Sequence, residues 1–128
     1  MTDHSSIQQV RDRLTGEENI WMATTRPDGR PHVAPLWFVW NDDRAYVMTG
    51  GVKLANVRNN GFAALNTEDG DDVVIIEGNA CIIPSTDPRF EPVAWLFETK
   101  YQWNIRNDVG DQQMIEITPV KTLMWNAK

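Results

Sequence analysis

The run Thr49-Gly50-Gly51-Val52-Lys53 holds the residues whose types and spacing are best suited to bind a ligand. A strand is expected to end at Thr49, and a helix is expected to begin after the two glycines with Lys53 in its first turn. The free N–H groups of that turn, the helix dipole, a hydroxyl and an ammonium would all favour a phosphate group. The run is not a Walker motif. On spacing alone, a plain glycine turn with Lys53 in solvent is the simpler interpretation.

Side chains that usually carry acid–base or metal chemistry are scarce. The only histidines are His4 and His32, which form no paired metal-ligand pattern, so we expect no metal site. His32 also lacks a patterned Ser or Cys partner, and we expect it to be structural or site-lining rather than a general base. Cys81 lies in an apolar run and is expected to be a buried small side chain. This scarcity fits chemistry that a bound cofactor supplies and the protein positions.

Length and charge exclude several classes of protein. The 128 residues, 41% of them hydrophobic, predict a single domain over residues 1–128 with a core that needs no disulfide. The net charge of -6, from 12 Lys and Arg against 18 Asp and Glu, opposes binding to nucleic acid. No stretch approaches the roughly 20 apolar residues of a membrane span, and the first residues carry no signal-peptide pattern. We therefore expect a cytoplasmic protein with neither nucleic-acid nor membrane partners.

Hydrophobic periodicity predicts a mainly β fold of six mostly antiparallel strands and three helices. The strands are expected at residues 20–25, 32–40, 45–49, 62–67, 73–83 and 113–125, the last bent at Pro119. The helices are expected at 5–16, 52–59 and 90–101. The first two strands should form a hairpin about the turn 26–30, with both strands substantially buried. The acidic loop 68–72 is expected to be a solvated turn, because it lacks the spacing of a calcium loop.

The run from Ala23 to Trp40 resembles the opening hairpin of the pyridoxamine 5'-phosphate oxidase-like, flavin/deazaflavin oxidoreductase superfamily. Segments 45–49, 61–65 and 74–80, and the helix start Lys53-x-x-Asn56, follow in the order found in that superfamily. The resemblance covers nearly the whole chain. It implies a six-stranded antiparallel split β-barrel with a few flanking helices. It further implies a homodimer with FMN or the deazaflavin coenzyme F-420 in a groove between the subunits, an interface that the six tryptophans would suit.

The resemblance also implies which residues would contact the cofactor. Thr49 and Lys53 would hold its phosphate, and Asn56 would support the start of that helix. Six further residues would line the ring through their backbone groups and side chains: Pro35, Leu36, Trp37, Phe38, Val47 and Met48. His32, at the start of the predicted strand 32–40, is a weaker candidate for contact with the ring. Trp103 and Asn104 would be placed to reach the partner subunit's cofactor. Relatives that bind FMN often carry an Arg just before the phosphate Lys, where this chain has Val52.

The implied function is an oxidoreductase that uses FMN or F-420 to pass a hydride to or from a small organic substrate. Two alternatives stay open on the same fold. One is a non-catalytic protein that binds flavin or haem. In its most specific version, His32 is an axial ligand of the haem iron. The other is a dimer that binds no cofactor. Vitamin B6 oxidation is not expected, because the chain ends soon after Trp125, without the C-terminal extension that grips that substrate.

Overall fold

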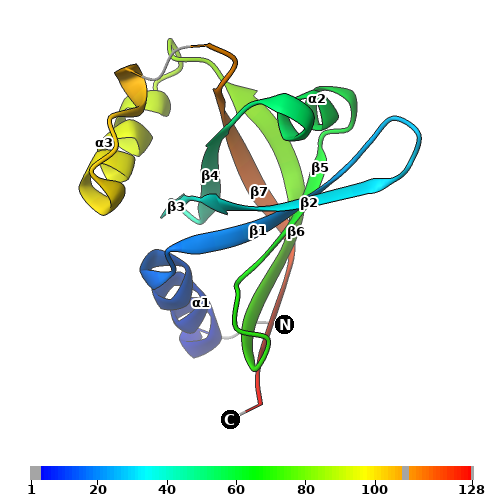
Figure 1. Cartoon of the computed structure of the whole chain (residues 1–128). Helices are drawn as coiled ribbons and strands as arrows, with labels where there is room; N and C mark the ends of the chain where they lie inside the picture. Colours follow the sequence, from blue (N-terminus) through cyan, green and yellow to red (C-terminus); the bar gives the residue numbers. More distant parts are fainter. Residues whose placement is uncertain (1–3, 108–109, 128) are drawn as a thin grey trace.

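The computed structural model describes residues 4–107 and 110–127 of the chain (Figure 1). In this part of the chain, seven strands, three α-helices and one short 3-10 helix follow one another as α1 (His4–Gly16), β1 (Asn19–Thr25), β2 (Pro31–Trp37), β3 (Val39–Asn41), β4 (Arg44–Thr49), α2 (Gly51–Asn59), β5 (Phe62–Asn66), β6 (Asp72–Ile83), α3 (Phe90–Tyr101), η1 (Ile105–Asn107) and β7 (Gln113–Asn126). The predicted class, antiparallel and mainly β with flanking helices, is confirmed. The strand count is seven rather than six.

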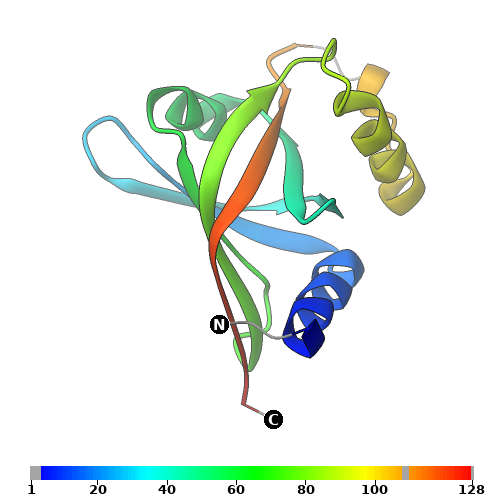
Figure 2. The same ribbon diagram turned by 180° about the vertical axis from the view of Figure 1, so that it is seen from behind.

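All seven strands belong to one sheet, in the order β2-β1-β5-β6-β7-β4-β3, and every neighbouring pair is antiparallel. Strands β6 and β7 form a long central ribbon, which Figures 1 and 2 both show. The edge strands β2 and β3 are separated in sequence only by Phe38, so the sheet must curl on itself. β3 pairs with β4 only through Arg44–Tyr46, which leaves residues 47–49 of β4 with no strand on that side. This gap is the split in the barrel.

The predicted strand 32–40 is divided at Phe38, and the division has a side-chain cause. The Tyr101 hydroxyl accepts a hydrogen bond from the Phe38 N–H at 3.0 Å and lies 2.7 Å from the Phe38 carbonyl oxygen. Lys100 Nζ donates to the same carbonyl at 3.1 Å and lies 4.3 Å from the centre of the Phe38 ring. Burial lowers the pKa of Lys100 to about 8. Two side chains of α3 thus replace the strand partners that Phe38 would otherwise need.

Burial of β2 also differs from the sequence prediction. In β1, buried Ile20, Met22 and Thr24 alternate with half-buried residues, as expected for a strand inside a sheet. In β2 no residue is buried, and half-buried residues alternate with exposed ones. The expectation of two substantially buried strands is therefore wrong for β2, because β2 lies at the edge of the sheet and pairs on one side only.

The core is formed by two groups of buried side chains on opposite faces of the sheet. The inner group fills the barrel and includes Leu14 of α1 and Leu54 of α2. The outer group packs α3 against the sheet and is centred on Phe97, which is fully buried. Apolar positions three or four residues apart on α3 face this second group, as the sequence predicted. Helix α2 therefore covers the inner side of the sheet and α3 the outer side.

Cys81 is exposed, so the expectation that it is buried is wrong. Its neighbour Ala80 points inward with 7% exposure, whereas Cys81 lies opposite Glu116 on the outer face of the sheet. Glu116 is buried and accepts hydrogen bonds from the Tyr46 hydroxyl at 2.6 Å and from Arg89 at 2.9 Å. Partial desolvation of the thiol and the charge of Glu116 raise the pKa of Cys81. The thiol is therefore a poor nucleophile despite its exposure.

Candidate functional site

The turn that joins β4 to α2 has the geometry of an open helix N-terminus. Gly51 has φ = +62°, a conformation that L side chains rarely adopt. Among the residues that the structure describes, no side chain caps the N-terminus of α2. Thr49 is buried at the end of β4, and its hydroxyl lies 3.4 Å from the Gly50 carbonyl, a long contact. Backbone N–H groups at the start of α2 therefore have no side-chain acceptor.

Lys53 is half-buried in the first turn of α2. Within the described residues, no hydrogen bond or ion pair ties its ammonium to another group. A half-buried cation that is not bonded to a carboxylate, beside an open helix N-terminus, favours an anionic ligand. The structure thus brings the predicted Thr49 and Lys53 to the same turn.

Asn56 fixes the position of α2 on the sheet. It is 2% exposed, and its Nδ2 donates to the hydroxyl of Thr24 on β1 at 3.0 Å; Thr24 is itself 2% exposed. A buried amide and hydroxyl that satisfy one another define one docking position for the helix. Asn56 lies one turn after Lys53 on the same face of α2, so this bond also sets where Lys53 lies.

His32 lies beside this helix start. It is the direct cross-strand partner of Thr24, and its side chain is half-buried on the inner face of the sheet. Its Nδ1 is buried and has no hydrogen-bond partner. Burial, and then the charges of Lys53 and Arg26, lower the pKa of His32. The neutral form of the imidazole is therefore favoured, and two cations act on it by charge.

Arg26 is the residue of this region that sequence reasoning missed. It begins the β1–β2 turn, and its Nη1 donates to the carbonyl of Pro31, next to His32, at 2.6 Å. No ion pair involves Arg26 among the residues that the structure describes. The β1–β2 turn and α2 lie at the same end of the molecule in both views (Figures 1 and 2). The sequence offered one signal for this residue. Arg26 is a second cation, and it lies in the turn of the hairpin that carries His32.

The residues expected to line a cofactor ring are divided among three environments. Pro35 and Trp37 are exposed on the outer face of β2, and Leu36 packs against the inner core. Phe38 and Val47 have no exposed side chain, so the ring contacts predicted for them would have to come from their backbone groups, and these contacts stay a prediction. Both are large apolar residues that the curled sheet turns into its interior.

Met48, Trp103 and Asn104 lie near the outer core. Met48 is 7% exposed and packs against α3. Trp103 meets Trp37 edge-on, with ring centres 5.9 Å apart, and Trp37 stacks on Tyr101 at 4.6 Å. The side-chain oxygen of Asn104 accepts a bond from the Arg106 N–H at 3.1 Å. Trp37 and Trp103 thus form one aromatic surface with Tyr101, and their contact with a cofactor stays a prediction.

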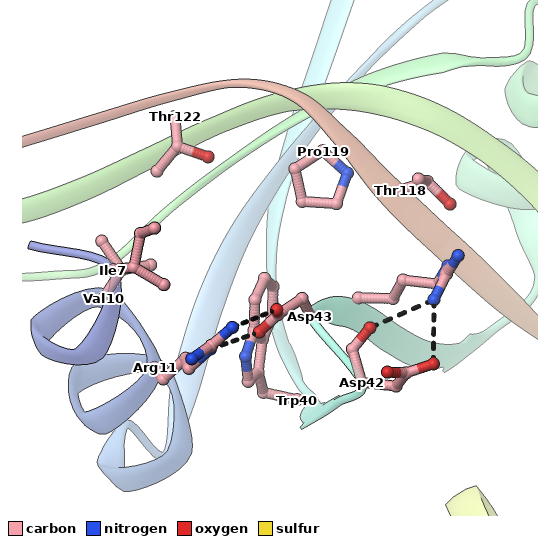
Figure 3. A pocket seen from close by; sticks show the side chains of 10 residues that line it. Ile7, Val10, Arg11, Trp40, Asp42, Asp43, Thr118, Pro119 and Thr122 are labelled. Atoms are coloured by element: carbon pink, nitrogen blue, oxygen red, sulfur yellow. Dashed lines mark hydrogen bonds and ion pairs between the residues drawn. The ribbon is translucent and has the colours of Figure 1, made fainter. Parts of the chain in front are cut away.

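The cavities of this single chain lie elsewhere. One of about 320 Å³ lies between α1, the β3–β4 turn and β7, with the ion pair of Arg11 and Asp43 and the ring of Trp40 along its wall (Figure 3). A second of about 460 Å³ lies between the start of α3, η1 and the adjoining ends of β6 and β7, and Met48 is the predicted site residue in its lining. The described residues contain no group of three metal-ligating side chains. In the described segments, no helix has both the length and the apolar character to cross a membrane.

A curled antiparallel sheet, split beside a glycine turn and a helix N-terminus, defines a split-barrel protein. The chain belongs to the pyridoxamine 5'-phosphate oxidase family, whose model matches residues 6–126. No curated protein matches the chain.

Solved structures share this fold at low sequence identity. The heme storage protein HutZ from Vibrio cholerae is 16% identical with a TM-score of 0.77, and the alignment covers 97% of this chain and 95% of that one. A conserved hypothetical protein from Mycobacterium tuberculosis is 21% identical with a TM-score of 0.81, covering 100% and 87%. An F-420 reductase is 23% identical with a TM-score of 0.68, covering 88% and 94%. These likenesses establish the fold alone.

Proposed function

We propose that the protein is an oxidoreductase that binds FMN or the deazaflavin F-420 and passes a hydride to or from a small organic substrate. One observation carries the proposal: Lys53 and Arg26, two cations without ion-pair partners among the described residues, lie near His32 beside the open N-terminus of α2. In a chain of this family, that arrangement suits the phosphate of a flavin-type cofactor. Arg26 would supply the second cation, because the position before Lys53 is occupied by Val52 and not by Arg.

The bound ring would supply the hydride chemistry, and the protein would supply binding and orientation. Lys53, Arg26 and the first N–H groups of α2 would hold the phosphate. Thr24 and Asn56 would keep the helix at a fixed distance from β1. The backbone of residues 47–49, which has no strand partner on its open side, would offer hydrogen bonds to the edge of the ring. No side chain at this site has the partners of a general acid or base.

We also propose that two copies of the chain complete the site. The strand register places Pro35, Trp21, Asn66, Ile75 and Leu123 in one row across the outer face of five strands. Other apolar residues on that face are exposed: Val33 at 57%, Phe62 at 43% and Trp125 at 60%. An exposed apolar face does not stabilise a monomer in water, whereas a second copy of the chain would bury it.

Leu123→Glu should weaken this dimer at least tenfold, because the new carboxylate would have to be desolvated within the apolar face, beside Ile75. Sedimentation velocity over a range of protein concentrations measures the change in dissociation constant. Trp95→Glu is the matched control, since Trp95 is also exposed, at 59%, but lies on α3 outside this face. A wild-type monomer at all concentrations, or equal effects of the two changes, would contradict the proposed interface.

Lys53→Ala should weaken binding of FMN or F-420 by about 10- to 100-fold, because it removes a charge-assisted bond to the phosphate. Separate titrations of the purified protein with FMN and with F-420, followed by cofactor fluorescence, measure the dissociation constants. Arg58→Ala provides the control, because Arg58 is an exposed cation in the last turn of the same helix. The proposed function is wrong if the wild-type protein binds neither cofactor.

Haem binding is the second candidate, and His32 is the observation that favours it. The lowered pKa keeps the imidazole in the neutral form that ligates iron. One structure with the same fold is described as a heme storage protein. A Soret band on titration with hemin that is lost in His32→Ala would support this function. Flavin binding without such a band would exclude it.

A further inference from the structure

His32 lies near two positive charges that come from different elements. Thr24, its cross-strand partner, is bonded to Asn56, which lies one turn after Lys53 on α2. Pro31, its chain neighbour, accepts the bond from Arg26. The hairpin and the helix therefore each bring one cation near enough to act on the imidazole by charge.

Two acidic residues of neighbouring segments lie near this region: Asp111, whose Cβ is 3.5 Å from where a Cβ on Gly50 would be, and the exposed Glu77 of β6. β1, β2 and β5 contain no charged side chain, and the one charged side chain of β4 is Arg44, at the opposite end of that strand from the turn. Helix α2 contributes only Lys53 and, in its last turn, Arg58. The charges of Lys53 and Arg26 both disfavour protonation of the imidazole and so lower the pKa of His32. The buried Nδ1 is left without a partner.

We propose that His32 is a third member of the anion subsite formed by Lys53 and Arg26, and that it takes up a proton when a phosphate group binds there. The inference rests on the anion subsite of the proposed function. A dianion between the two cations offsets their charge and attracts a proton to the imidazole. By linkage, an anion that promotes protonation binds more tightly as the pH falls. The subsite would therefore favour dianionic phosphate esters, and its affinity would depend on pH.

Sulfate is a suitable probe, because it remains a dianion throughout the range in which His32 titrates. The pKa of His32 should rise when sulfate is added, as followed by the NMR signals of the imidazole between pH 5 and 9. Sulfate should bind about tenfold more tightly at pH 5.5 than at pH 8. In His32→Asn this dependence on pH should be lost, and the missing signal assigns His32 apart from His4.

Three further variants test the geometry. Lys53→Gln and Arg26→Gln should each weaken sulfate binding and reduce its effect on the pKa of His32. Arg30→Gln should behave as the wild type, because Arg30 lies in the same turn but pairs with Asp28. Sulfate binding that leaves the pKa of His32 unchanged, or no sulfate binding by the wild type, would overturn the inference.

The same signals distinguish this inference from the proposed function. If FMN binds and the pKa of His32 does not move, proton uptake is wrong and the cofactor proposal stands. If sulfate raises the pKa of His32 while neither FMN nor F-420 binds, the anion subsite stands and the cofactor proposal is wrong.

Discussion

Phe97→Ala should lower the free energy of unfolding by about 3 to 5 kcal/mol, the cost of removing a buried phenyl group and leaving a cavity. Phe97 has no exposed surface, and its ring lies 5.5 Å from the ring of Trp103 and 6.0 Å from that of Tyr101. These contacts seat α3 on the sheet. Urea unfolding at a fixed protein concentration measures the change, with the midpoint falling and the slope unchanged.

Trp95→Ala is the control for this prediction. Trp95 lies on the same helix and is also a large aromatic residue, but 59% of its side chain is exposed. Its removal should cost less than about 1 kcal/mol. Similar costs for the two changes would show that α3 is not seated on the sheet by Phe97.

Gly78→Ala should destabilise the protein by about 3 kcal/mol or more, because the new methyl group has no space between β6 and β7. A Cβ at Gly78 would lie 2.3 Å from the Thr118 carbonyl oxygen and 2.9 Å from its carbon. The register between the strands shifts at this point, where Glu77 pairs with Lys121 but Gly78 pairs with Pro119. Both obstructing atoms belong to the backbone, so relief would require the central ribbon to move apart. Thermal and urea unfolding measure the loss.

Gly70→Ala is the matched control, because a Cβ there meets nothing within 4 Å. It should change the free energy of unfolding by less than about 1 kcal/mol. If Gly78→Ala cost no more than Gly70→Ala, the close approach of the two strands at the bulge would be wrong. The bulge also accounts for the bend that the sequence predicted at Pro119, since proline is tolerated where ladder pairing is interrupted.

Most of the elements could be predicted because their signals are local. Alternating apolar residues marked β1 and β6, and the turn 26–30 marked the first hairpin. The glycines at 50 and 51 correctly separated β4 from α2. The break at Phe38 could not be predicted, because Tyr101 and Lys100, which cause it, lie more than 60 positions further along the chain.

The residues of the candidate site likewise differ in how far the sequence could predict them. Thr49, Lys53 and Asn56 were predicted from a short run of sequence, and the structure places them on one turn and helix. The convergence of Arg26 on His32 depends on how the hairpin is placed against α2. Phe38 and Val47 were predicted to line the ring through backbone groups and side chains, and the curl of the sheet turns their side chains into the core.

The sequence by itself determined the antiparallel, mainly β architecture, the glycine turn before α2 and the family to which the chain belongs. These properties depend on periodicity, turn chemistry and the order of short segments, all of which are local. The tertiary structure decided that His32 lies near two cations, that Cys81 is exposed and that Glu116 is buried with its partners. Each of these depends on strand register and helix docking, because a shift of one residue moves a side chain to the opposite face of the sheet.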